Sequence, residues 1–83
     1  MGKRQQNERK FGAWQDLEDG GRRYSCDVAG RNGWRARYVK EVRPDESTVR
    51  FFQEVYDPQG ILREVHYKFP TDSGHKTVKG GER

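Results

Sequence analysis

Beyond scattered carboxylates, four side chains in this sequence have the chemistry of metal ligands or acid-base catalysts: His66, His75, Cys26 and Asp72. No pair of them has the spacing of a known metal site, so the sequence predicts no metal centre. Two histidines among cationic side chains are also the groups that a small ribonuclease needs as general acid and general base. Because His75 falls in a polar, glycine-rich segment where little would hold it rigidly, we predict no catalytic residue and no cofactor.

A second group of side chains interleaves arginines with aromatic rings. It consists of Arg35, Arg37, Arg50, Phe52, Tyr56, His66 and Lys68. Surfaces that bind single-stranded nucleic acid use this combination, because rings stack on bases while arginines hold phosphates. The alternative is that the rings form a small apolar cluster with Val39 and Leu62, and that the arginines are solvated partners of nearby glutamates. The sequence leaves both interpretations open.

The composition is that of one small, polar domain. Of the 83 residues, 30% are hydrophobic and 36% are charged, which leaves little room for a large enzyme cleft. A core of this size supplies about 3 to 5 kcal/mol, so self-association is one way in which such a domain gains stability. Seventeen basic and thirteen acidic side chains give a net charge of +4, a weak indication of a polyanionic partner.

The single cysteine, Cys26, excludes an internal disulfide. A lone thiol is typical of a reducing compartment. No apolar run has the length of a signal-sequence core or of a membrane span. We therefore expect a cytoplasmic protein with no membrane partner.

The candidate residues lie on segments in which apolar side chains recur at every second position. These segments are residues 22–28, 34–42, 49–56 and 61–69. A period of two is typical of strands with one buried face, and turn residues separate the segments. The sequence thus predicts a mainly β fold with a four-stranded antiparallel meander.

The two hairpin turns, GRNG at 30–33 and DPQG at 57–60, each end in glycine. A three-residue loop with a left-handed glycine and a G1 bulge fits both of them. In the first hairpin this loop sets Val28 opposite Ala36, so that apolar residues share a face.

In the last hairpin the same loop length places Phe51 in the core opposite Tyr67. Neighbouring residues of a strand point to opposite faces, so Phe52 lies on the other face, opposite His66. This register also sets Glu54 opposite Glu64 and Arg50 opposite Lys68, and such like-charge pairs are mildly destabilising. These pairs are the one observation against the predicted register.

The segments that flank the meander are less regular. Residues 1–10 are basic and contain no hydrophobic residue after Met1, so we expect a disordered basic leader. The spacing of Phe11, Trp14 and Leu17 favours a short helix over residues 11–19 that covers part of the sheet, and an extra strand turning at EDGG is the alternative. Residues 73–83 are predicted as a flexible tail, which leaves 11–72 as a single β-rich domain.

Three functions follow from these patterns. The first is a non-enzymatic binding module for single-stranded RNA or another polyanion. The second is a protein-interaction or structural module, a homodimer in which a second copy covers the exposed face of the sheet. The third is a small toxin-like ribonuclease that depends on His66.

Overall fold

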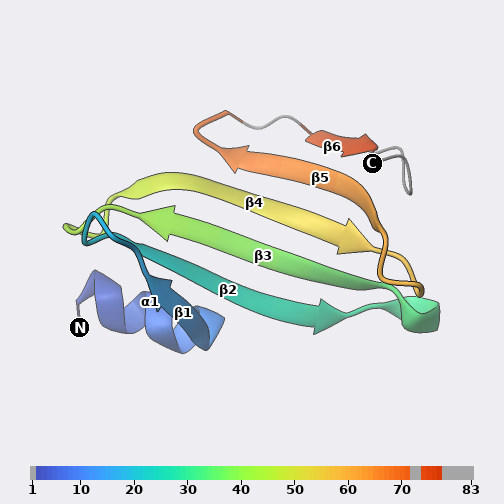
Figure 1. Cartoon of the computed structure of the whole chain (residues 1–83), viewed down its shortest axis with the longest axis horizontal. Helices are drawn as coiled ribbons and strands as arrows, with labels where there is room; N and C mark the ends of the chain where they lie inside the picture. The colour runs from blue at the N-terminus through green and yellow to red at the C-terminus, as the bar shows by residue number, and fades with distance from the viewer. Residues whose placement is uncertain (1, 72–73, 78–83) are drawn as a thin grey trace.

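The computed structural model describes residues 2–71 and the backbone of residues 74–77. They form one short α-helix and a six-stranded antiparallel sheet whose strands follow one another in chain order (Figure 1). The elements are α1 (Lys3–Phe11), β1 (Ala13–Asp16), β2 (Arg22–Ala29), the 3₁₀ turn η1 (Arg31–Gly33), β3 (Arg35–Val42), β4 (Thr48–Tyr56), β5 (Leu62–Phe69) and β6 (Gly74–Thr77). The mainly β fold is confirmed, with the four predicted strands as β2 to β5. No described helix is long and apolar enough to cross a membrane.

The first difference from the sequence prediction concerns the basic leader, because Lys3–Phe11 form helix α1 instead of a disordered segment. The helix has no apolar stripe, since Asn7 and Phe11 are its buried residues. Basic residues occupy its last turn, where they complement the helix dipole, and Gly12 ends it with a left-handed φ of 83°. Its stability comes from contacts with the sheet, which a local pattern does not reveal.

The helix predicted over residues 11–19 is wrong, and the alternative of an extra strand is confirmed. Ala13–Asp16 form β1, which pairs antiparallel with β2. The chain then reverses, and the N–H of Leu17 donates to the carbonyl of Gly21 at 2.9 Å. A Cβ atom on Gly21 would overlap the carbonyl oxygen of Val42, so the turn requires glycine where it passes β3.

Both predicted three-residue loops are confirmed. The N–H of Gly30 donates to the carbonyl of Trp34 at 2.7 Å, and the equivalent bond closes the loop that follows β4. The glycines that end the two loops have φ of 84° and 83°. The predicted register of β2 and β3 is present, with Val28 opposite Ala36.

The predicted register of the last hairpin is wrong by one residue. A β-bulge at the start of β5 shifts the pairing, so Phe52 lies opposite Tyr67 rather than His66. One extra residue in a strand turns the side chains that follow it to the other face. The shift also moves Glu54 away from Glu64, so the predicted like-charge pair does not form.

Phe51 lies on the core side as predicted, although a second bulge in β5 sets it opposite Phe69 rather than the predicted tyrosine. Its ring packs edge-on against Phe11, with centroids 6.1 Å apart. Phe11, Tyr24 and Val42 are buried together and form the core. Helix α1, which lies along β1 and β2 at one end of the sheet (Figure 1), covers this core.

The alternation of side chains gives the sheet two faces. Helix α1 packs on one of them, the helix face, which on β2 to β5 includes Arg22, Tyr24, Cys26, Val28, Ala36, Tyr38, Lys40, Val42, Thr48, Phe51, Gln53, Val55, Glu64, His66, Lys68 and Phe69. The open face, on the opposite side, includes Arg23, Ser25, Asp27, Ala29, Arg35, Arg37, Val39, Glu41, Arg50, Phe52, Glu54, Tyr56, Leu62, Val65 and Tyr67. Phe51 and Phe52 thus lie on different faces, as the sequence predicts.

Strand β6 lies within the segment predicted as a flexible tail. Gly74–Thr77 pair antiparallel with β5, and His75 is in register with His66. The sheet therefore continues past residue 72. The tail residues 73 and 78–83 lie outside the described residues.

Candidate functional site

The structure brings five of the seven candidate binding residues together on the open face. Those five are Arg35, Arg37, Arg50, Phe52 and Tyr56. His66 lies on the helix face, in register with Gln53. Lys68 is also there, with its Nζ 5.2 Å from the ring centroid of Tyr38. The bulges in β5 explain both differences, and they bring Tyr67, which the sequence assigned to the core, to the open face.

An aromatic pair lies at the centre of the open face. The rings of Phe52 and Tyr67 have centroids 5.3 Å apart and are tilted by 40°. Val39, which pairs with Phe52 on the neighbouring strand, is 5% exposed, whereas Tyr67 is 39% exposed. The pair therefore has a packed side that fixes its position and an exposed side that an incoming ring can contact.

A third ring, Tyr56, carries two arginines. The guanidinium carbons of Arg35 and Arg37 lie 5.7 and 5.9 Å from its centroid, within range of a cation–π contact. The hydroxyl of Tyr56 donates to Glu54 at 2.9 Å. Burial and then this bond raise the pKa of Tyr56, so the hydroxyl stays protonated at neutral pH and keeps the ring in place.

A buried carboxylate positions two arginines beside the aromatic pair. Glu41 is 8% exposed and accepts bonds of 2.7 Å from the Nε atoms of Arg23 and Arg50. Burial acts to raise the pKa of Glu41, but the bonds from the two arginines outweigh it and leave that pKa lowered. Arg50 also lies over the ring of Phe52, with its guanidinium carbon 5.9 Å from the centroid. The ionised Glu41 thus fixes a cation next to a stacking surface.

The open face carries little net charge. Its charged side chains in the described part of β2 to β4 are Arg23, Arg35, Arg37, Arg50, Asp27, Glu41 and Glu54. Four cations against three anions leave +1. Arg37 donates its Nε to Asp27 at 2.8 Å, and this bond lowers the pKa of Asp27. A guanidinium has five N–H donors, of which one carboxylate takes at most two, so a paired arginine can still donate to a phosphate.

These side chains surround a groove of about 430 Å³. Arg23, Arg37 and Arg50 line it together with Glu41 and Phe52. Its volume falls in the lower part of the range of about 300 to 1,000 Å³ that is typical of ligand sites. The groove gives a bound chain a place to lie between the arginines and the ring of Phe52.

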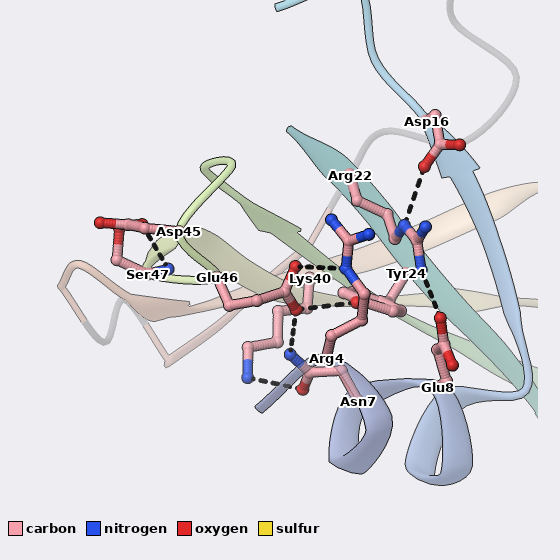
Figure 2. Close-up of polar contacts among 10 residues, drawn as sticks. All are labelled: Arg4, Asn7, Glu8, Asp16, Arg22, Tyr24, Lys40, Asp45, Glu46 and Ser47. Atoms are coloured by element: carbon pink, nitrogen blue, oxygen red, sulfur yellow. Dashed lines mark hydrogen bonds and ion pairs between the residues drawn. The ribbon is translucent and has the colours of Figure 1, made fainter. Parts of the chain in front are cut away.

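The loop between β3 and β4 places a second carboxylate over the helix face, the 9% exposed side chain of Glu46, which ties α1 to the sheet (Figure 2). Glu46 accepts a bond of 2.8 Å from the hydroxyl of Tyr24 and one of 3.2 Å from the amide of Asn7. Arg4 adds an ion pair at 3.4 Å. Burial acts to raise the pKa of Glu46, and the three bonds lower it by more. Glu46 also has a φ of 69°, which is uncommon outside glycine and indicates that these contacts hold the backbone.

Arg22 is the second anchor of the helix (Figure 2). It is 7% exposed and donates to Glu8 on α1 at 2.7 Å and to Asp16 on β1 at 2.8 Å. The bond to Glu8, opposed by burial and assisted by Asp16, raises the pKa of Arg22 above its ordinary value. One side chain therefore joins three elements, which is a structural role.

Lys40 on the helix face has a lowered pKa, and such a shift is a signal that functional sites share with structural ion networks. Burial lowers the pKa of Lys40, and its Nζ donates to Asn7 at 3.0 Å. Lys40 and Glu46 line a groove of about 520 Å³ beside the N-terminal half of α1. Because Asn7 and Glu46 both bridge the helix to the sheet, we assign this cluster to helix docking.

The histidines of the ribonuclease hypothesis occupy neighbouring positions, since His75 on β6 is in register with His66 on β5. The side chain of His75 lies outside the described part of the chain, so the ribonuclease stays a hypothesis beside the prediction of no catalytic residue. Among the described residues, no three His, Cys, Asp or Glu side chains group in a way that could hold a metal ion.

The chain matches no protein-family model, no curated protein and no solved structure. A fold by itself assigns no chemistry, so the side chains of the open face are the basis for assigning a function.

Proposed function

We propose that the protein is a non-enzymatic module that binds single-stranded RNA on its open face. The observation that carries this proposal is the pair of a half-buried Phe52 and an exposed Tyr67, which has Arg50 above the ring of Phe52. The binding residues are Arg35, Arg37, Arg50, Phe52, Tyr56 and Tyr67. His66 and Lys68 leave the predicted set because they lie on the helix face.

Stacking supplies most of the affinity in this proposal. Base–aromatic stacking is worth about 1 to 3 kcal/mol per base, and two neighbouring rings accommodate successive bases. With a net charge of +1 on the face, the electrostatic contribution is small. Phosphate contacts from Arg35, Arg37 and Arg50 correspond to a slope of about −2 in a plot of log affinity against log salt.

Two aromatic residues of β5 provide a matched test. Tyr67 and Phe69 are 39% and 44% exposed, and they lie on opposite faces of the sheet. Tyr67→Ala should weaken binding of a labelled oligouridine about 5- to 150-fold, measured by fluorescence anisotropy at low salt, while Phe69→Ala should leave it unchanged. An equal loss in both variants, or no binding by the unmodified protein, contradicts the proposal.

The same samples test the ribonuclease alternative. Gel analysis of the RNA after several hours should show intact oligonucleotide. Cleavage that His66→Ala abolishes would replace the binding module with the enzyme.

One observation favours a second candidate, the homodimer. Strand β1 pairs with Arg22–Ser25, so the outer edge of β2 from Cys26 to Ala29 has no strand partner in the described chain. An open edge of this kind takes a strand from a second copy. Light scattering over a wide concentration range tests this candidate, and a monomer at every concentration contradicts it. A cytoplasmic location, proposed from the lone Cys26, is compatible with either candidate.

A further inference from the structure

Part of the helix face lies beyond the end of α1. There a groove of about 330 Å³ opens, lined on its apolar side by Phe11, Cys26, Val28, Tyr38 and Phe51. Phe11 belongs to the buried core, while Val28 is 48% exposed. An exposed valine beside half-buried rings is apolar surface that a ligand of modest size can bury.

Two lysines complete the lining of this groove. The Nζ of Lys68 lies 5.2 Å from the centroid of Tyr38 and 5.6 Å from that of Phe51. The Nζ of Lys10 lies 5.8 Å from the centroid of Phe11. None of the residues that line the groove is acidic, and neither lysine forms an ion pair within the described chain. Two ammonium groups therefore lie over aromatic rings without a neutralising carboxylate.

Lys40, on the same face, shows that the positive charges act on one another. Burial lowers the pKa of Lys40, Lys10 and Lys3 lower it further, and Glu46 acts in the opposite direction. Lys10 lines the groove, so the charge that acts on Lys40 across this face also adds positive potential at the groove, where it attracts an anion.

We propose that this groove binds a small amphipathic anion, an apolar chain or ring that carries one carboxylate or sulfonate. The apolar part lies on Val28 and the rings, and the anionic group lies between Lys10 and Lys68. The site is on the face opposite the proposed RNA surface, so the two functions are independent of each other.

Cys26 provides a direct readout, because it lines the groove and is the single cysteine of the chain. Octanoate should slow alkylation of Cys26 by iodoacetamide, measured by mass spectrometry, to a saturable limit. Octylammonium, which has the same chain and the opposite charge, should give no protection. Equal protection by both compounds, or none by octanoate, overturns the proposal.

Charge variants locate the anionic group. Lys68→Gln and Lys10→Gln should each weaken octanoate about 1.5- to 5-fold, the range for one exposed ion pair. Arg9→Gln removes the same charge from the neighbouring position of α1, outside the groove, and should have no effect. Loss in Arg9→Gln equal to that in Lys10→Gln overturns the proposal. So does an alkylation rate of Cys26 that rises on dilution without octanoate, since a second copy would then cover the groove.

Discussion

The two faces of the sheet each contain a buried glutamate, and the two glutamates do different work. Glu46 on the helix face binds Tyr24 and the α1 residues Asn7 and Arg4, so it serves tertiary structure. Glu41 on the open face binds two arginines of neighbouring strands, whose side chains remain 44% and 47% exposed. The same kind of carboxylate therefore has two roles. Where helix α1 lies against it, it docks the helix; where solvent lies against it, it orders a cationic surface.

The largest effect on stability should come from removing the aromatic ring of Phe11, which closes the helix face. Phe11 is 6% exposed and packs against Tyr24 and Phe51. Phe11→Ala should lower the free energy of unfolding by about 3 to 5 kcal/mol, most of what a domain of this size has. Urea unfolding followed by circular dichroism measures the loss. Phe11→Leu, expected to cost less than about 1.5 kcal/mol, keeps the test informative if the alanine variant does not fold.

If Phe11→Ala left stability unchanged, α1 would not contribute to the core, and the contrast between the two faces would fail. RNA affinity of Phe11→Leu should equal that of the unmodified protein, because the contact lies on the face opposite Tyr67.

The strands of the sheet could be predicted because the patterns that specify them involve residues close together in the sequence. The period of two and the loop glycines identify β2 to β5 and the register of the first hairpin. Helix α1 was missed because Glu8 and Asn7 dock it through polar contacts with residues far along the chain, and such contacts leave no apolar period. The helix did have a readable stop signal, two basic residues followed by Gly12.

The candidate site was predictable only in part, for a related reason. Five candidate residues lie on the predicted face because β3 and β4 pair without a register shift from Arg35–Tyr56 to Glu41–Arg50, and the bulge of this strand pair lies beyond them: Arg35, Arg37, Arg50, Phe52 and Tyr56. The candidate residues of β5 lie on the face opposite to the predicted one, because a bulge reverses the faces and no single residue type indicates such a bulge in the sequence. The conflict between Glu54 and Glu64 in the unbulged register was the available signal.

Acid should produce the next largest effect, because it removes charge from both buried glutamates. The pKa values of Glu41 and Glu46 are lowered from the ordinary 4.5. Their contribution to the free energy of unfolding is therefore complete well above pH 4.5 and is lost as the pH falls through the lowered pKa values. The urea midpoint should therefore fall between about pH 5.5 and about pH 3. Glu46→Gln should show a weaker pH dependence. A midpoint that stays constant over this range contradicts the assignment.

Glu41→Gln should have the smallest effect on stability and the most specific effect on function. It removes one acceptor charge from Arg23 and Arg50, which should cost about 1 to 2 kcal/mol of unfolding free energy, measured by urea unfolding. The same change raises the net charge of the open face from +1 to +2. With Glu41 neutral, Arg23, which lines the same groove, can contact a phosphate in addition to Arg35, Arg37 and Arg50, so the slope of log RNA affinity against log salt should steepen by about 0.7.

The matched variant is Glu46→Gln, which changes the same residue type at similar burial on the other face. It should lower stability and leave the salt slope unchanged. If both variants steepened the slope equally, the change would reflect the net charge of the whole chain rather than a site. A steeper slope in Glu41→Gln alone would locate the phosphate contacts beside Phe52 and Tyr67, where the ion pairs of Glu41 otherwise restrain the arginines.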